Sequence, residues 1–339
     1  MMANRLIAIC PLILAAITTG LAAPRAEQPA AGHSEIVPLP TLGGKQFWAD
    51  ELFFHQWRIQ RNVLTGHCRL LDAHQLRHAW GTFPECQANL EKIKAARKLP
   101  PMQGKAVIVL HGLFRSRSSM NRLSKYLADK GGYIVFNIGY PSTQREVGSH
   151  ARALQRIVEN LDGVEEINFV GHSMGNIIIR HYLADRDRNP NPPGARPGRF
   201  VMLGPPNQGS LAAVALAENA AFRILSGKAG QQLGAEWAKL EGKLATPDFQ
   251  FGIVAGGMNN ATGFNPLLPG DDDGTVTTAS TRLAGARDFV VVPVLHSFLV
   301  LDGKVLKYTL KFLQQGYFIA ADKRCPIAGD DKARVTNDQ

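Results

Sequence analysis

Apolar runs alternate with amphipathic stretches between residues 105 and 313. The apolar runs, which are typical of strands buried on both faces of a sheet, lie at 105–110, 133–138, 166–170, 199–203, 249–255 and 288–293. Stretches with apolar residues at helical spacing lie among them, at 118–130, 147–161, 176–183 and 306–313. Strands that alternate with helices predict an α/β protein with a mostly parallel sheet, which helices cover on both sides.

Residues 45–100 precede this alternation and have a different pattern. Short runs at 57–60 and 68–71 predict two paired strands around Thr65-Gly66. Residues 84–98 predict a helix, because Pro84 stands near its start and basic residues crowd its end. We therefore expect a small mixed extension before the main sheet.

Residues 210–247 interrupt the alternation in the second half of the chain. Their apolar residues, Leu211, Val214 and Leu233 among them, predict two or three short helices. These helices form either a mobile apolar lid over a site or a fixed cap packed on the body, and the pattern leaves both open.

The N-terminus is typical of a secretory signal peptide. Arg5 supplies positive charge, and an apolar run from Leu6 to Ala23 ends in small residues. An uncleaved membrane anchor is the alternative, because the run is about 18 residues long. Cleavage is favoured, and we expect export to the periplasm, the cell envelope or the medium. The expected organisation is a signal peptide at 1–23, a flexible tether at 24–44, one domain at 45–320 and a tail at 321–339.

Composition limits the function classes. Hydrophobic residues make up 45% of the chain and charged residues 19%, which suits a globular protein with a sizeable core. The net charge of +10 is spread along the sequence and does not alternate with aromatic residues as a nucleic-acid platform would. We expect no nucleic-acid partner and at most loose contact with an anionic envelope surface. The oligomeric state stays open.

Cysteine usage fits export. Without the leader, Cys68, Cys86 and Cys325 remain, which allows either a Cys68–Cys86 disulfide with one thiol left over or three unpaired, buried thiols. No Cys/His grouping has zinc spacing, and no nucleotide or redox-cofactor motif is found. We expect neither a metal nor a cofactor.

The sequence Gly171-His172-Ser173-Met174-Gly175 lies between the run at 166–170 and the helix at 176–183. A G-x-S-x-G between a strand and a helix is typical of the tight turn that presents a nucleophilic serine. Glycine is needed at the flanks because a side chain there would collide with the backbone. Ser173 is therefore the candidate nucleophile.

A nucleophilic serine needs a histidine base, and the base needs an acid that orients it. Behind such a turn the chain order is serine, acid, histidine. Only His181 and His296 follow Ser173, and His181 lies in the helix that leaves the turn. His296, which follows the strand at 288–293, is the expected base.

The acid is expected in the loop after the strand at 249–255. Asp271-Asp272-Asp273-Gly274 ends that loop, and Asp273 is our choice, with Asp272 the nearest alternative. An acyl-transfer site also needs two N–H donors for the oxyanion. We expect these from the backbone of Met174 and of Leu113, where Gly112 permits close approach, and we expect His111 to pack beneath the site.

Together these motifs resemble the lipase/esterase branch of the α/β-hydrolase superfamily, and in particular compact bacterial lipases with an HGL loop. The resemblance rests on His111-Gly112-Leu113, the GHSMG turn, the PPNQGS segment at 205–210 and the DDDGTV segment followed by His296, and it covers about residues 104–318. It implies the α/β-hydrolase fold with a small helical cap at 210–247. It also implies a triad of Ser173, Asp273 and His296, with the amides of Leu113 and Met174 as oxyanion donors.

The chain departs from calcium-dependent bacterial lipases at one place. Those proteins carry an acidic calcium-binding pattern after the histidine, whereas Ser297-Phe298-Leu299-Val300 follows His296 here. We therefore expect no structural calcium.

The expected function is an exported serine hydrolase that cleaves carboxylic esters through an acyl-serine intermediate. The apolar segment at 210–247 favours lipidic or otherwise hydrophobic acyl groups. A thioesterase, amidase or acyltransferase acting on envelope lipids would use the same triad. A third possibility is a hydrolase-fold binding protein without turnover, although such proteins usually lack a triad residue and all three are present here. The acyl length and the physiological substrate stay open.

Overall fold

The computed structural model describes residues 39–40, 45–215 and 219–329. All of these belong to one compact unit, Val37–Gln339. The expected signal peptide at 1–23 lies outside the described residues, as do most of the expected tether and residues 330–339 of the tail. Among the described residues, no helix combines the length and the apolar character that a bilayer span requires.

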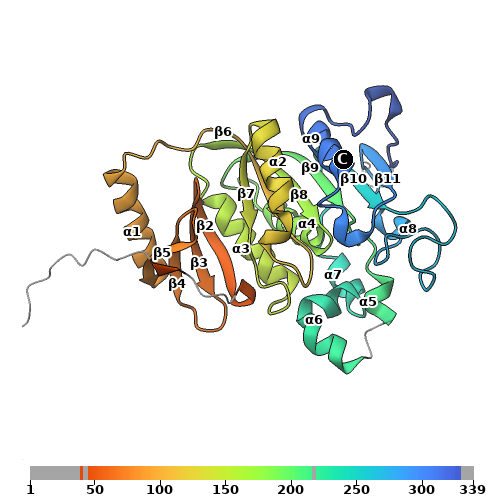
Figure 1. The fold of residues 1–339 in the computed structure, drawn as a ribbon, viewed down its shortest axis with the longest axis horizontal. Coiled ribbons are helices and arrows are strands. Elements are labelled where there is room, and N and C mark those ends of the chain that lie inside the picture. The colour runs from red at the N-terminus through yellow and green to blue at the C-terminus, as the bar shows by residue number, and fades with distance from the viewer. Residues whose placement is uncertain (1–38, 41–44, 216–218, 330–339) are drawn as a thin grey trace, which may run out of the picture. The chain divides into compact units, whose positions relative to one another are not determined.

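A six-stranded parallel sheet forms the centre of the unit (Figure 1). Its order is β11-β10-β9-β8-β6-β7, and every neighbouring pair is parallel. The strands are β6 (Gly104–Leu110), β7 (Ile134–Ile138), β8 (Val164–His172), β9 (Arg196–Leu203), β10 (Phe251–Gly256) and β11 (Asp288–Val292). The α/β class and the parallel sheet expected from the apolar runs are confirmed.

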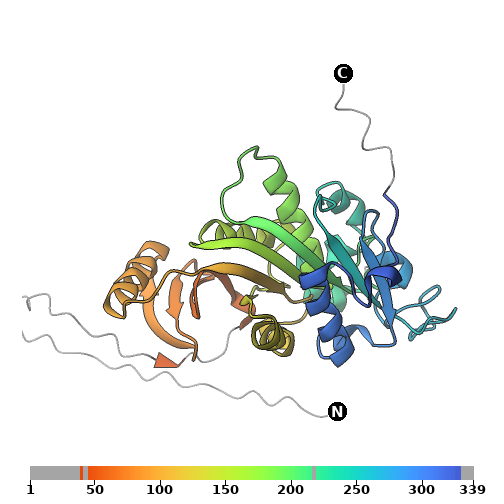
Figure 2. The same cartoon turned by 90° about the horizontal axis from the view of Figure 1, so that it is seen from above.

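Helices cover both faces of this sheet (Figure 2). Val107 and Val109 of β6 share a core with α2 (Asn121–Gly131) and α9 (Gly303–Gln315). Ile108 of the same strand joins the opposite core, which includes α3 (Val147–Glu159) and α4 (Met174–Asp187). Successive side chains of a strand point to opposite faces, so each face of the sheet has its own hydrophobic core.

A second sheet precedes the first and is antiparallel, with the order β1-β5-β4-β3-β2. Its strands are β1 (Leu39–Pro40), β2 (Trp48–Phe54), β3 (Trp57–Asn62), β4 (Cys68–Leu71) and β5 (Leu76–Gly81). The expected pairing of 57–60 with 68–71 is present as β3 and β4. The expected helix is α1 (Phe83–Ala96), which begins with a capping box between Thr82 and Glu85. The two-residue strand β1 lies within the range assigned to the tether.

Asp50 of β2 joins the two sheets. Its Oδ2 accepts a hydrogen bond from the N–H of Gly139, just beyond β7, at 2.6 Å, and its own N–H donates to the Gly139 carbonyl at 2.9 Å. Its Oδ1 lies 2.6 Å from Nε2 of Gln60 and 3.3 Å from Nε of Arg58. This carboxylate is fully buried, so its three contacts, to Gly139, Gln60 and Arg58, replace its hydration.

Three short helices form the segment expected as a cap: α5 (Leu211–Ala215), α6 (Ala220–Leu233) and α7 (Trp237–Glu241). Gly227 interrupts α6 with φ 60°, and a Cβ there would lie 1.9 Å from the Thr143 carbonyl oxygen. Gln232 accepts a hydrogen bond from the N–H of Val147 at 2.9 Å. The helices thus rest on the loop that leads into α3.

The remaining short elements are η1 (Lys45–Phe47), η2 (Arg117–Met120), α8 (Thr278–Thr281), η3 (His296–Phe298) and η4 (Ala321–Lys323).

The structure holds Cys68, Cys86 and Cys325 as free thiols. Cys68 and Cys86 are both fully buried, on β4 and α1, whereas Cys325 is exposed. Burial, assisted by the neighbouring Cys68, raises the pKa of the Cys86 thiol to about 12. The arrangement is the unpaired alternative considered above, except that the third thiol is on the surface.

We predict that Asp50→Ala lowers the free energy of unfolding by about 3–5 kcal/mol, because it leaves the buried Arg58 guanidinium without its carboxylate. Urea unfolding followed by circular dichroism measures the change. The control is Asp129→Ala, which removes an exposed partner of Lys125 on α2 and should cost about 0.5 kcal/mol. Equal losses in the two variants would show that Asp50 does not join the sheets.

Candidate active site

Ser173 occupies the turn between β8 and α4 in an unusual backbone conformation, with φ 55° and ψ −126°. Its N–H donates to the Leu203 carbonyl at the end of β9, at 2.9 Å. A Cβ at position 171 would lie 2.3 Å from Oδ1 of Asn176, and one at position 175 would lie 2.6 Å from the Leu110 carbonyl oxygen. A side chain at either flanking position would therefore collide with a neighbouring atom, so both positions need glycine, as the motif predicts.

His296 and Asp273 form a close pair, although they come from different loops. Nδ1 of His296 donates to Oδ2 of Asp273 at 2.6 Å, and the His296 N–H donates to the Asp273 carbonyl at 2.8 Å. Both side chains are buried. Oδ1 of Asp273 accepts the N–H groups of Thr275 at 3.1 Å and Val276 at 2.7 Å. The carboxylate is thus fixed on both oxygens, and Nε2 is the ring nitrogen left for another partner.

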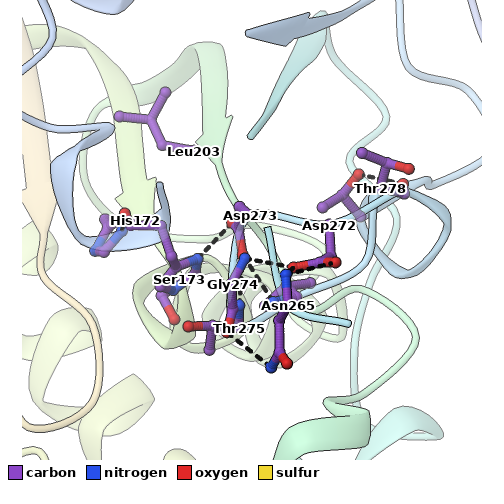
Figure 3. A network of polar contacts seen from close by, with 12 residues as sticks. His172, Ser173, Leu203, Asn265, Asp272, Asp273, Gly274, Thr275 and Thr278 are labelled. Atoms are coloured by element: carbon purple, nitrogen blue, oxygen red, sulfur yellow. Dashed lines mark hydrogen bonds and ion pairs between the residues drawn. The ribbon is translucent and has the colours of Figure 1, made fainter. Parts of the chain in front are cut away.

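The other aspartates of this loop are engaged elsewhere (Figure 3). Asp272 is buried and accepts the N–H groups of Gly274 at 2.6 Å and Asn265 at 3.1 Å. Asp271 accepts the N–H groups of Met258 and Asn259. Asp272 and Asp271 therefore shape the loop, and Asp273 is the one aspartate of the three that contacts His296 within the described chain.

Ser173 and His296 line the same cavity, whose volume is about 520 Å³. Gly112 lies against the serine, since a Cβ at position 112 would be 2.9 Å from the Ser173 Cβ. Gly204 lies against the histidine pair, because its Cβ would be 3.1 Å from Nδ1 of His296. The sequence-predicted residues, distant along the chain, therefore converge on one cavity.

The two amides expected as oxyanion donors are those of Leu113 and Met174. Within residues 45–215 and 219–329, neither N–H donates a hydrogen bond. Leu113 lines the cavity, whereas Met174 follows the nucleophile directly and is fully buried. Their catalytic role, like that of the triad, stays a prediction here.

Sequence reasoning missed two residues that brace the site. Nε2 of His172 donates to the His296 carbonyl at 3.0 Å and so supports the loop that carries the histidine. Nδ2 of Asn176 donates to the carbonyls of Ser173 at 3.0 Å and Leu203 at 3.3 Å. His172 stands inside the GHSMG motif, so its position beside the nucleophile was the available signal. Nothing in the sequence pattern marks Asn176.

His111 packs beneath the site, as expected. Its ring stacks on Tyr140 with centroids 4.1 Å apart, and the Tyr140 hydroxyl donates to the His111 carbonyl. Nδ1 of His111 donates to the Gly112 carbonyl at 2.9 Å. Complete burial lowers the pKa of His111 to about 4, so the imidazole is neutral near pH 7.

The decisive features are the strand order, the strand–serine–helix turn after β8 and the histidine that follows the last strand. The chain has the α/β-hydrolase fold. No protein-family model matches it, and no curated protein matches it.

Solved structures of α/β-hydrolases are distantly similar. The mature form of a lipase from Bacillus licheniformis is 20% identical, over 60% of this chain and 89% of that chain, with a TM-score of 0.45. An esterase from Pyrobaculum calidifontis is 16% identical, over 64% of this chain and 78% of that chain, with a TM-score of 0.45. The phospholipase PlaB from Legionella pneumophila is 20% identical, over 52% of this chain and 45% of that chain, with a TM-score of 0.40. The fold is established independently, by the strand order and turns described above.

Among the described residues, no cluster of three His, Cys, Asp or Glu side chains could hold a metal ion. The residues at the cavity can instead donate, accept and relay protons, and one of them, Ser173, carries a hydroxyl that is partly exposed there.

We predict that the protein loses stability in acid through buried histidines near this site. Burial lowers the pKa of His111 to about 4, of His150 to about 3, and of His172 well below its ordinary value. The unfolded chain therefore binds more protons below pH ~6.5, and the free energy of unfolding falls as pH drops from there to about 4. Each histidine contributes a slope of up to about 1.4 kcal/mol per pH unit.

Urea unfolding between pH 7 and pH 4.5 measures this slope. His150→Phe should reduce it, because one buried proton-accepting ring is removed and the replacement still packs on Tyr140. His74→Gln, at an exposed position, is the control and should leave the slope unchanged. A steeper or identical slope in His150→Phe contradicts the assignment.

Proposed function

We propose that this protein is an exported serine hydrolase that cleaves carboxylic esters with hydrophobic acyl groups. The observation that carries the proposal is the His296–Asp273 pair, joined at 2.6 Å, on the wall of the cavity that Ser173 also lines. A serine, an imidazole and a buried carboxylate in one site are the parts that nucleophilic acyl transfer needs.

In the proposed reaction the Ser173 oxygen attacks the acyl carbon while Nε2 of His296 takes the hydroxyl proton. Asp273 holds Nδ1–H and stabilises the imidazolium that forms. The N–H groups of Leu113 and Met174 stabilise the negative charge on the carbonyl oxygen. His296 then returns the proton to the leaving alcohol, and water, activated by the same ring, releases the acid from the acyl-serine.

The walls of the cavity support a hydrophobic acyl group. Its apolar lining residues are Leu113, Phe114, Pro206, Ala212, Ala213, Leu233 and Val276, and its polar ones besides Ser173 and His296 are Arg115, His172, Ser210, Asn265, Thr275 and Ser297. Its volume of about 520 Å³ lies in the usual range for small-molecule sites. The helices beside it expose Ile224 at 81% and Leu225 at 65%.

Export is proposed from the sequence of the leader, whose positive residue and apolar run are those of a signal peptide. The basic character of the chain, +10 overall, is compatible with loose association with an anionic envelope surface. Detection of the processed protein in periplasmic or medium fractions tests this part of the proposal.

We predict that Ser173→Ala abolishes both hydrolysis of p-nitrophenyl esters and labelling by a fluorophosphonate probe. Asp273→Asn should keep the fold but lower kcat by about 10⁴-fold, because the amide no longer holds the correct histidine tautomer. Asp162→Asn, an exposed change outside the site, is the control and should keep full activity. Wild-type protein that binds but never turns over any ester, thioester or amide would refute the proposal. Preference for thioester or amide substrates would instead assign the same machinery to the alternative reactions.

Acyl-length preference tests the cavity itself. Ala212 lines it, whereas Ala215, on the same short helix, is exposed and does not. Ala212→Trp should lower kcat/KM for a p-nitrophenyl decanoate by about tenfold or more, equal to at least ~1.4 kcal/mol, with a smaller effect on the acetate. Ala215→Trp should change neither. Equal losses on both esters in Ala212→Trp would place the acyl chain elsewhere.

A further inference from the structure

A second cavity lies behind the loop that carries Gly112 and Leu113, and the proposed reaction does not use it. Its volume is about 200 Å³, and it lies between the antiparallel sheet and the end of β7. Its walls include Trp48, Arg58 and Arg69 on one side and His111, Arg117 and Tyr140 on the other. No acidic side chain is among the described residues that line it.

The charges around this cavity do not balance. Three guanidinium groups line it, those of Arg58, Arg69 and Arg117. Asp50 lies against Arg58, and Asp72 also acts on Arg58 electrostatically. Arg58 is 3% exposed and Arg69 is 8% exposed, whereas Arg117 is half-buried. Burial lowers the pKa of Arg58 and of Arg69 to about 10, so both stay charged near pH 7. Three guanidinium groups against two carboxylates leave this wall with a net positive charge.

Polar atoms in the wall also lack partners. Nε of Arg58, Nη1 of Arg117 and Nε2 of His111 are buried without a hydrogen bond, although Nε of Arg58 lies 3.3 Å from Asp50. Buried polar groups of native proteins are rarely left this way, because each lost hydrogen bond costs free energy. The two arginine nitrogens are donors. Nε2 of His111 is an acceptor, because Nδ1 carries the proton given to the Gly112 carbonyl.

We propose that this cavity binds a small tetrahedral dianion that carries one hydroxyl, of which hydrogen phosphate is the simplest example. A phosphate group carries about −1.5 to −2 at pH 7, which complements the net positive charge of the wall. Its oxygens accept from Arg58 and Arg117, for which guanidinium is a preferred partner. Its P–O–H donates to Nε2 of His111. The volume lies below the ~300 Å³ at which sites for larger ligands begin.

This inference does not depend on the proposed function. His111 lines this cavity, whereas Gly112, Leu113 and Ser173 line the other one. The loop therefore separates the two sites, and phosphate can bind whether or not esters are cleaved.

Isothermal titration of the full chain with inorganic phosphate, at constant ionic strength and pH 7, tests the site. We expect saturable binding of one phosphate per chain. Arg117→Gln, which removes a half-buried cation of the wall, should weaken binding by about tenfold or more. Arg122→Gln, an exposed change on α2, should leave the affinity unchanged. Far-UV circular dichroism confirms that both variants are folded. Absence of saturable binding to wild type, or equal affinity in Arg117→Gln, overturns the proposal.

Two further ligands identify the chemistry. Sulfate has the same shape and charge but no hydroxyl at pH 7, so it should bind more weakly than phosphate if His111 accepts from the ligand. Glycerol 3-phosphate distinguishes a free phosphate from a phosphate monoester such as a lipid headgroup. The dianion of a monoester carries no P–O–H, so glycerol 3-phosphate, like sulfate, should bind more weakly than phosphate. Comparable affinity would extend the site to monoesters and contradict the role of His111, and exclusion would restrict the site to the free ion. Sulfate that binds more tightly than phosphate contradicts the role of His111.

A crystallographic measurement on the wild-type protein covers the case in which Arg117→Gln does not fold. Crystals soaked in arsenate, which has the shape, charge and hydroxyl of hydrogen phosphate, should show an anomalous peak between Arg58, Arg117 and His111. A peak only at other surface arginines, or none, overturns the assignment of the site.

Discussion

The structure around Ser173 depends on one close approach of two backbones. The helix that begins at Met174 passes so near the end of β6 that a methyl group at Gly175 would lie 2.6 Å from the Leu110 carbonyl oxygen. This contact places the serine against Gly112 and beside the loop after β6. The Ser173 N–H completes the arrangement by donating to Leu203 of β9. Three parallel strands therefore determine where the hydroxyl stands, and the positive φ at Ser173 is maintained by their packing.

The fold and the candidate site were predictable to different degrees. Continuous apolar runs identified the six parallel strands, because strands buried on both faces leave no other pattern. The serine turn predicted Ser173 as the nucleophile, and the order of the histidines along the chain predicted His296 as the base. Asp273, which we chose over Asp272, is the aspartate that contacts His296. The sequence alone could not distinguish the two, because Asp272 accepts hydrogen bonds from Asn265 and Gly274 only in the folded loop.

The antiparallel sheet was predicted only in part. β3 and β4 were predicted as a pair, whereas β2 was not. β2 is buried along its whole length and contains Asp50 and Glu51, which a sequence reading places on the surface. Both carboxylates are buried because arginines from other elements reach them: Arg58 contacts Asp50, and Arg61 and Arg156 contact Glu51. Pairs of this kind have no local signature, since Arg156 is 105 residues away from its partner.

His111 connects the two cavities physically. Its carbonyl accepts from the Tyr140 hydroxyl and its Nδ1–H donates to the Gly112 carbonyl, so hydrogen bonds tie the ring to the loop that carries Leu113. The same residue lines the arginine-lined cavity, and its Nε2 is buried without a hydrogen bond. A ligand that accepts from the arginines and donates to Nε2 would restrain the ring, and with it the loop beside Ser173. Thermodynamic linkage makes such a coupling reciprocal, so an acyl group bound to Ser173 would change the phosphate affinity by the factor by which phosphate changes acyl binding.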